Sequence, residues 1–174
     1  NKGYGWAKRF LEQKFLLLSE INNIKLKIVR PFNIYGERYR WVGEYSGAIP
    51  MLVKRIMDNE DPLYAWGSGK QRRSYMHAYD CAKIMELIME NDQKNILVNI
   101  GTEETISISE LVNLICKLSG KKPKIFFDTT KPEGRFIKSS DSSHLKELIG
   151  KELVSINLEE GIKKMISWYK TNFV

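Results

Sequence analysis

Hydrophobic residues recur at helical spacing in several separate stretches of the chain. The first stretch runs from Tyr4 to about Ile21, where apolar side chains return every three or four residues, as on one face of an α-helix. A capping box at Ser107 and Glu110 begins another predicted helix, and Gly120 ends it. Further helices are predicted over residues 48–57, 79–89 and 143–148 and after Asn157.

A strand that runs out into a loop is predicted after the first helix. Residues 26–31 include the β-branched Ile28 and Val29, which favour a short buried strand. Pro31 cannot donate to a sheet ladder and Asn33 is a turn former, so pairing should stop there. Ligands bind at this carboxyl end of strands in open α/β sheets, although an ordinary strand and turn fits the stretch equally well when it is taken alone. Other extended segments are predicted over residues 63–66, 73–77, 96–100 and 124–127, and polar loops over 37–47 and 129–140.

The alternation of helices with strands predicts an α/β fold. The 174 residues suffice for one domain with a real core. The strands are too few for a complete doubly wound sheet, and a lone parallel strand over residues 26–31 would leave unpaired edges. We therefore expect another segment to complete this sheet, or the chain to behave poorly alone. Because the sequence begins at Asn1 without Met and is helical in pattern at once, we expect the second half of a longer protein.

The composition is that of a soluble globular protein, with 43% hydrophobic and 28% charged residues. No apolar run is long enough to cross a bilayer and no signal peptide opens the chain, so we expect a cytoplasmic protein with no membrane partner. Cys81 and Cys116 lie inside apolar helical patterns and are predicted to be buried thiols in a reducing compartment. With His77 and His144 as the remaining candidate ligands, no zinc-type cluster is expected.

The net charge of +7 is spread along the chain. Nucleic-acid binding would require basic residues concentrated on one face with aromatic residues between them. Here the basic residues are scattered, with small clusters at residues 70–73, 121–122 and 163–164. A solvated basic surface is therefore the favoured interpretation, with a basic nucleic-acid-binding domain as a distant alternative. A pocket for a phosphate-bearing small molecule is compatible with the same surface.

Tyr4 and Lys8 are the first candidates for chemistry. They are four residues apart on a predicted helix, so both side chains project from one face. A nearby ammonium favours the phenolate of a tyrosine, which lowers its pKa and lets it act as a general acid or base. Tyr79 and Lys83 repeat this spacing. By spacing alone, a surface tyrosine at a helix start is therefore the better interpretation of Tyr4.

A series of motifs places this pair in a wider pattern. The motifs are Tyr-Gly-Trp-Ala-Lys at 4–8, Arg-Pro-Phe-Asn-Ile-Tyr-Gly at 30–36, Trp-Gly-Ser-Gly at 66–69 with Gln71 and Arg73, His-Ala-Tyr-Asp at 77–80, Asn-Ile-Gly at 99–101 and Asp-Thr-Thr-Lys-Pro-Glu-Gly at 128–134. Together they span nearly the whole chain, and in this order they resemble the extended short-chain dehydrogenase/reductases that modify nucleotide sugars. The runs at 66–69 and 128–134 look most like those of the GDP-L-fucose synthases and their relatives.

The resemblance implies the C-terminal part of an extended Rossmann-type fold with a small α/β substrate-binding domain. Residues 1–36 would be the tail of the Rossmann domain, comprising the catalytic helix and the strand that follows it. Residues 37–174 would be mainly the substrate-binding domain, with short segments that return to the Rossmann sheet. The resemblance also suggests a homodimer formed through the helix that carries Tyr4.

The resemblance also assigns roles to individual residues. Tyr4 would be the acid or base at the sugar C4 oxygen, and Lys8 would hold the nicotinamide ribose and tune Tyr4. The loop at Pro31 and Phe32 would lie against the nicotinamide of NAD or NADP, and Asn33 would face the substrate. The remaining matches, at positions that grip the GDP group, are Leu52, Arg55, Trp66, Arg73 and Lys131. An indole can stack on a purine and a cation can hold a diphosphate. Core packing for Trp66 and a solvated strand end for Arg73 are the alternatives.

Two departures from the family pattern limit the expected reaction. Gly47 stands where the fucose synthases carry the histidine that serves as the acid for C3/C5 epimerisation, and the cysteine paired with that histidine would lie outside this chain. A simpler 4-reductase, 4-epimerase or dehydratase therefore competes. No Gly-x-Gly-x-x-Gly follows a strand, so the dinucleotide-binding half is expected to precede Asn1.

These observations predict the C-terminal half of an NAD(P)-dependent enzyme that acts at C4 of a nucleotide sugar, with a GDP-sugar as the expected substrate. Its partners would be the missing N-terminal half and a second subunit. The chain alone is expected to be inactive. The alternative is a non-catalytic module that binds a nucleotide sugar without a cofactor site.

Overall fold

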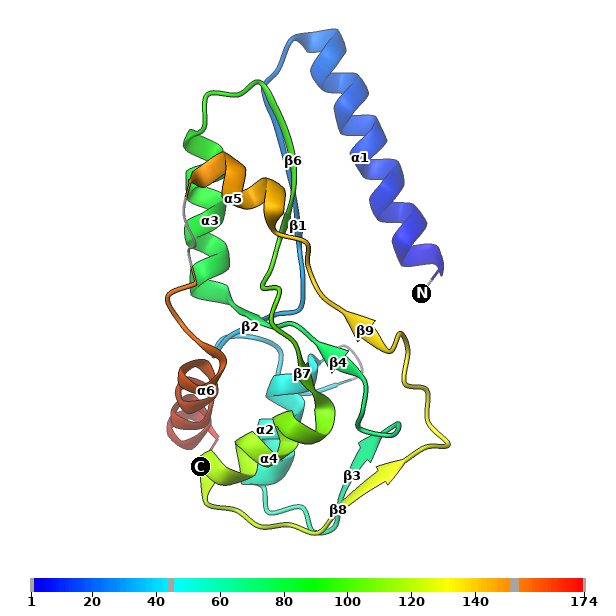
Figure 1. Ribbon diagram of the computed structural model, residues 1–174, viewed down its shortest axis with the longest axis vertical. Coiled ribbons are helices and arrows are strands. Elements are labelled where there is room, and N and C mark those ends of the chain that lie inside the picture. The colour runs from blue at the N-terminus through cyan, green and yellow to red at the C-terminus, as the bar shows by residue number, and fades with distance from the viewer. Residues whose placement is uncertain (1, 44–45, 151–153, 174) are drawn as a thin grey trace.

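The computed structural model describes residues 2–43, 46–150 and 154–173, in which helices and short strands alternate as predicted (Figure 1). The helices are α1 (Lys2–Asn22), α2 (Ala48–Met57), α3 (Ala78–Glu90), α4 (Ile108–Ser119), α5 (Ser143–Ile149) and α6 (Leu158–Asn172). The strands are β1 (Leu26–Pro31), β2 (Ile34–Tyr35), β3 (Leu63–Trp66), β4 (Arg72–Arg73), β5 (Met76–His77), β6 (Asn95–Ile100), β7 (Ile106–Ser107), β8 (Ile125–Asp128) and β9 (Ile137–Lys138).

The longest strands, β1 and β6, form a parallel pair in the middle of the molecule (Figure 1). Their register joins Leu26 to Asn95 at one end and Pro31 to Ile100 at the other. The pairing continues for one more bond, since the Phe32 amide donates to the Ile100 carbonyl at 2.8 Å. Within the described residues β1 pairs with β6 alone, so its other edge is open, as expected for a sheet that another segment completes.

The remaining strands form small sheets, and here one prediction was wrong. Residues 73–77 were expected to form one extended run, but β4 pairs with β7 and β9 whereas β5 pairs with β2. The chain changes neighbours at Ser74 and Tyr75, so the run is split between two sheets. The strands β2, β7 and β9 were not predicted, because strands of two residues carry no periodic signal.

Buried side chains form two hydrophobic clusters. One gathers around α2, α4 and α6, together with Tyr35, and the other lies between α3, α5 and β6. Gly161 in α6 contacts Tyr35 so closely that a Cβ there would overlap the tyrosine hydroxyl. Cys81 is buried and Cys116 is partly buried; both are free thiols, and burial raises the pKa of each, consistent with the predicted buried thiols.

Helix α1 lies beside β1 with most of its apolar side chains uncovered, away from the rest of the molecule (Figure 1). The side chains of Trp6 and Phe10 are each 70% exposed. The helix is held by a double hydrogen bond, in which Nε and Nη2 of Arg30 donate to the Glu12 carboxylate at 2.8 and 2.6 Å. The apolar face of α1 is thus left uncovered by the described residues. None of the helices in the described residues is both long and apolar enough to span a membrane.

The predicted ends of α4 are confirmed. The Ser107 hydroxyl accepts a hydrogen bond from the Glu110 amide at 3.1 Å, and the Glu110 carboxylate accepts one from the Ser107 amide at 2.8 Å. Gly120 closes the helix with φ of 72°, in the left-handed region that favours glycine. Asn157 caps α6, as predicted: its side-chain oxygen accepts a hydrogen bond from the Glu160 amide at 2.9 Å.

The capping box yields a stability prediction. Ser107→Ala should lower the free energy of unfolding by about 1 kcal/mol, because it leaves the Glu110 amide without its acceptor. Ser167→Ala is the matched control, since this exposed serine in α6 makes no side-chain hydrogen bond among the described residues. Urea denaturation of the two variants measures the difference. Equal stability of both would show that the cap contributes nothing.

Candidate functional site

A cleft of about 660 Å³ lies at the edge where β1 ends. It is lined by Tyr4 and Lys8 of α1, Pro31 at the end of β1, Asn33 just after it, Gly47 to Pro50 at the start of α2, and Tyr39, Gln71, Arg73, Tyr75, Ile108 and Glu133 among others. The structure therefore brings five of the predicted site residues to one place. These five come from segments widely separated in the sequence.

The predicted pair on α1 faces this cleft. The Lys8 Nζ lies 5.6 Å from the centroid of the Tyr4 ring, which is 68% exposed. The second pair with the same spacing, Tyr79 and Lys83, is closer still, at 4.7 Å, and Tyr79 raises the pKa of the Lys83 ammonium. Tyr79 lines a different cavity, on the side of α6. Position at the end of β1 thus singles out Tyr4 and Lys8, whereas their spacing does not.

The turn after β1 is held by its own side chains. Asn33 adopts a positive φ of 44°, and its side-chain amide donates to the Ser74 carbonyl at 2.8 Å. This bond fixes Asn33 in the wall of the cleft. Phe32 is partly buried and packs against Gly101, where a Cβ would be 3.0 Å from the Phe32 Cβ. Phe32 is adjacent to the cleft-lining residues and is not one of them.

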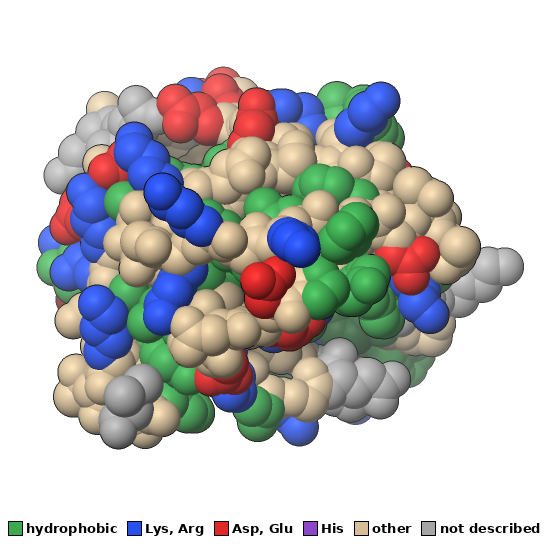
Figure 2. Space-filling model, turned by 90° about the horizontal axis from the view of Figure 1, so that it is seen from below, with side chains coloured by type: hydrophobic (Ala, Val, Ile, Leu, Met, Phe, Trp, Pro, Cys, Tyr) green, Lys and Arg blue, Asp and Glu red, His purple; other side chains and the backbone are tan. Residues whose placement is uncertain are grey.

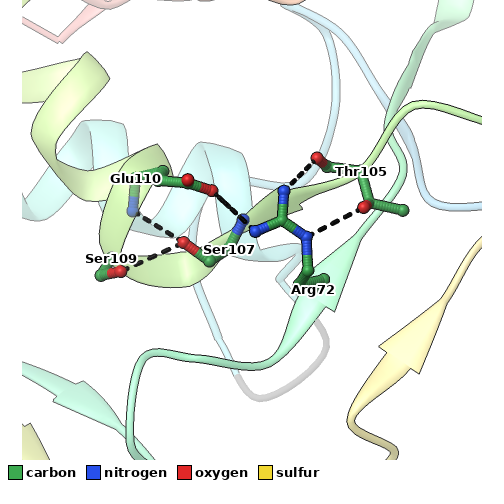
Figure 3. A network of polar contacts seen from close by, with 5 residues as sticks. All are labelled: Arg72, Thr105, Ser107, Ser109 and Glu110. Carbon is green, nitrogen blue, oxygen red and sulfur yellow. Dashed lines mark hydrogen bonds and ion pairs between the residues drawn. The ribbon is translucent and has the colours of Figure 1, made fainter.

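The neighbouring arginines of β4 have opposite surroundings. Arg72 donates from Nε and Nη2 to Thr105 at 3.0 and 2.7 Å and forms an ion pair of 3.1 Å with Glu110, so it joins β4 to the cap of α4 (Figure 3). Arg73 instead donates to the carbonyls of Arg72 and Glu133 at 2.7 and 3.1 Å. Among the described residues no carboxylate pairs with Arg73, so its positive charge is available to an anion in the cleft.

Trp66 ends β3 next to a tight turn. Its side chain is 62% exposed, so it does not pack in the core, and it is not one of the cleft-lining residues. Gly67 and Gly69 have φ values of 80° and 75°. The side-chain amide of Gln71 donates from Nε2 to the Trp66 carbonyl at 3.0 Å. Lys131 is exposed on the loop after β8, anchored by its own amide to the Asp128 carbonyl at 3.2 Å.

Leu52 and Arg55 are not brought to the cleft. Leu52 is 2% exposed because the helical period of α2 places it with Ile49 and Val53 on the face that packs in the core. Arg55 donates from Nε to the Glu60 carboxylate at 2.7 Å. Their contact with a nucleotide, expected from the family resemblance, stays a prediction.

Several lining residues were not among the site residues predicted from the sequence. Burial raises the pKa of the Tyr75 hydroxyl to about 12 against the opposing influence of Arg73, so this group stays protonated at neutral pH. Gly47 lines the cleft, and a Cβ there would be 3.3 Å from the Tyr39 ring. Glu133 lies in the 128–134 run that carried the resemblance, which is the signal that could have identified it.

Basic side chains do not form one patch on the face seen in Figure 2, where they lie interspersed with acidic and hydrophobic ones. This distribution agrees with the scattered basic residues of the sequence. It offers no continuous stripe for a nucleic-acid backbone on that face.

Comparison with known proteins gives a consistent picture. The model of the NAD dependent epimerase/dehydratase family matches residues 1–101. GDP-L-fucose synthase of Dictyostelium discoideum is 29% identical over 99% of this chain and 55% of its own length. A putative UDP-glucose 4-epimerase of Methanocaldococcus jannaschii is 31% identical over 97% of this chain and 53% of its own length. The chain thus spans about half the length of the curated relatives it matches.

Solved structures confirm the predicted fold class. UDP-glucose 4-epimerase of Thermotoga maritima, in a structure with UDP-glucose, superposes with a TM-score of 0.85 at 25% identity, covering 98% of this chain and 54% of that one. A GDP-L-fucose synthetase of Naegleria fowleri superposes with a TM-score of 0.83 at 22% identity, covering 98% and 55%. The latter likeness shows the fold alone.

The glycine turn beside the cleft yields a test of its packing. In Gly69→Ala a Cβ would overlap the Phe127 ring and the residue would be held at positive φ. Gly120→Ala is the control, since it shares the positive φ but has nothing within 4 Å of the added atom. We expect the control to lose about 1 kcal/mol of unfolding free energy and Gly69→Ala to lose about 1–3 kcal/mol more. Equal losses would mean that Phe127 moves away freely.

Proposed function

The chain belongs to the NAD dependent epimerase/dehydratase family, and we propose that it supplies the catalytic helix and the nucleotide-sugar site of an enzyme acting at C4 of the sugar. The single observation that carries this proposal is the cleft that unites Tyr4, Lys8, Asn33 and Arg73. It combines a proton-transfer group, a cation to tune it and a cation for an anionic substrate at the carboxyl end of β1.

Proton transfer at C4 would fall to Tyr4. Its hydroxyl would give a proton to the C4 oxygen, or take one from it, as the carbon is reduced or oxidised. The Lys8 ammonium would stabilise the phenolate by charge and hold a ribose hydroxyl. When bound, NAD or NADP supplies the hydride acceptor or donor for C4. Pro31 fits the nicotinamide end, because it presents an apolar surface beside Tyr4 and Lys8.

Substrate binding would depend on the charges and the aromatic ring near the far end of the cleft. Arg73 has no carboxylate partner among the described residues, which suits a diphosphate. Lys131 is exposed on the next loop, and Trp66 offers an exposed indole on which a base could stack. Asn33 would contact the sugar. Relatives named GDP-L-fucose synthase favour a GDP-sugar, although relatives named for UDP-sugars keep that choice open.

The rest of the cofactor site would come from outside residues 1–174. This sequence has no glycine-rich dinucleotide turn, and both the open edge of β1 and the bare face of α1 would suit a Rossmann half. We propose that residues 1–36 belong to that half and residues 37–174 mainly to the substrate-binding domain. A homodimer formed through α1 would cover part of the same apolar surface.

The glycine at position 47 limits which reactions we propose for this site. Without a side chain at this position, the cleft lacks the histidine that would protonate C3 or C5. Reduction, epimerisation or dehydration that begins at C4 is therefore preferred. A purely binding role is the second candidate, favoured by the fact that the proposed diphosphate contacts lie in this chain whereas the dinucleotide turn does not.

Calorimetric titration of the 174-residue chain tests the substrate proposal. We expect GDP to bind more tightly than UDP or dTDP, and NADPH not to bind. Arg73→Ala should weaken GDP binding by about tenfold or more, because a charge-assisted contact is lost. Arg72→Ala, the matched control in the same strand, should lower stability and leave the affinity unchanged. Absence of binding for every nucleotide by a folded chain would contradict the proposal.

Tyr4→Phe tests the catalytic assignment in a protein that contains this chain with its dinucleotide-binding half. Turnover should fall by about a hundredfold to ten-thousandfold, since general acid–base catalysis contributes about 10²–10⁴, while GDP-sugar affinity stays nearly intact. Tyr79→Phe, which alters the other tyrosine with the same spacing, should leave turnover unchanged. Parallel loss of affinity and turnover in Tyr4→Phe would mean that Tyr4 is structural.

A further inference from the structure

We propose that Glu133 is a positioning residue. It holds the segments that carry the proposed nucleotide contacts in fixed positions relative to one another. This inference rests on the proposed function, since the segments in question carry Trp66, Arg73 and Lys131. Glu133 needs no contact with the nucleotide in this role. It acts through the turn at residues 67–69 and through the guanidinium of Arg73.

The first contact joins Glu133 to the turn that follows Trp66. The Glu133 carboxylate accepts a hydrogen bond from the Ser68 amide. The Glu133 methylene groups pack directly on Gly67, where an added Cβ would overlap the Glu133 Cγ. Both the polar and the apolar part of this side chain therefore hold the turn. The direction in which Trp66 leaves β3 depends on that turn, because the indole lies immediately before it.

The second contact joins the Glu133 main chain to Arg73. The Glu133 carbonyl accepts from Nη2 of Arg73 at 3.1 Å, and the Phe136 carbonyl accepts from Nη1 at 3.4 Å. A Cβ on Gly134 would be 3.6 Å from the same Nη2, so the loop backbone at Gly134 also lies next to the Arg73 guanidinium. Carbonyl groups orient the arginine without neutralising it. The loop thus orients the Arg73 guanidinium, and the positive charge of this group remains available to an anion.

The third observation concerns the ends of the loop. At its start the Asp128 carbonyl accepts from the amides of Gly67 and Lys131 at 2.8 and 3.2 Å. At its end β9 pairs with β4. Between these anchors, Glu133 provides the contact from the middle of the loop to the 67–69 turn. Without it, the middle of the loop would be held to the rest of the site by the hydrogen bonds from Arg73 and would have no tie to the 67–69 turn.

The physical reason for such a residue is the entropy of binding. A nucleotide that must order a loop loses part of its binding energy, whereas a site already ordered keeps it. Glu133 lines the same cleft, so its negative charge opposes a bound diphosphate. The length of the Glu133 side chain therefore favours nucleotide binding, whereas its negative charge opposes it. Substitutions that change only one of the two properties separate these effects.

Glu133→Gln keeps the length of the side chain and an oxygen acceptor but removes the charge. Glu133→Asp keeps the charge but is one methylene shorter, so it cannot both reach Ser68 and cover Gly67. In calorimetric titration of the 174-residue chain with GDP, we expect Glu133→Gln to bind within about threefold of the unchanged chain. We expect Glu133→Asp to bind about tenfold more weakly, which corresponds to about 1.4 kcal/mol.

Glu90→Gln is the matched control, because Glu90 is exposed at the end of α3 and makes no side-chain hydrogen bond or ion pair among the described residues. Its GDP affinity should not change, and the thermal midpoints of all variants should stay close together. Combining Glu133→Asp with Arg73→Lys should cost less than the sum of the separate losses, because Glu133 acts partly through Arg73. Additive losses would mean that Glu133 does not act through Arg73.

Other results would overturn the proposal. Equal affinity for all Glu133 variants would show that the loop needs no tie, and tighter binding by Glu133→Asp would show that the native contact hinders the nucleotide. A strong loss in Glu133→Gln with none in Glu133→Asp would mean that the charge is what matters. A folded but otherwise unchanged chain that binds no nucleotide would instead refute the proposed function.

Discussion

The parallel pairing of β1 with β6 is the constraint on which the candidate site depends. Parallel strands have their carboxyl ends at the same edge of a sheet. The register joins Leu26 to Asn95 and Pro31 to Ile100, and a shift of one residue would turn every side chain of β1 to the opposite face. At that edge the chain turns at Asn33 and at Gly101. Helix α1 lies along β1 and thereby brings Tyr4 and Lys8 to the same place. The cleft is therefore a consequence of where the main chain leaves the sheet.

The small sheet around β4 divides structural and functional roles between adjacent residues. Successive side chains of a strand point to opposite faces. Arg72 therefore reaches the cap of α4 and is neutralised by Glu110, whereas Arg73 faces the cleft and is held by carbonyl groups alone. The guanidinium of Arg72 thus stabilises a helix on one face of the strand, and that of Arg73 remains available to an anion on the other. The loop that carries Glu133 belongs to the second arrangement.

The candidate catalytic pair lies on the least covered element of the molecule. Helix α1 contacts the rest through β1, through the hydrogen bonds between Glu12 and Arg30, and through the buried Ser19, whose hydroxyl donates to the Asn95 side chain of β6. Its other faces expose large apolar side chains such as Trp6 and Phe10. A segment that packed on these faces would also hold Tyr4 and Lys8 at the cleft, so the proposed catalysis depends on how α1 is held.

Local sequence determined the helices, their caps and the main strand, because periodicity, the capping box at Ser107 and the left-handed Gly120 act over a few residues. The family motifs pointed to Tyr4, Lys8, Asn33 and Arg73, which the structure unites. Only the tertiary structure decided what depends on distant contacts. It split residues 73–77 between two sheets, created β2, β7 and β9 by pairing, and turned Leu52 into the core. It also placed Glu133 between the glycine turn and Arg73, since such contacts form between segments that no local pattern connects.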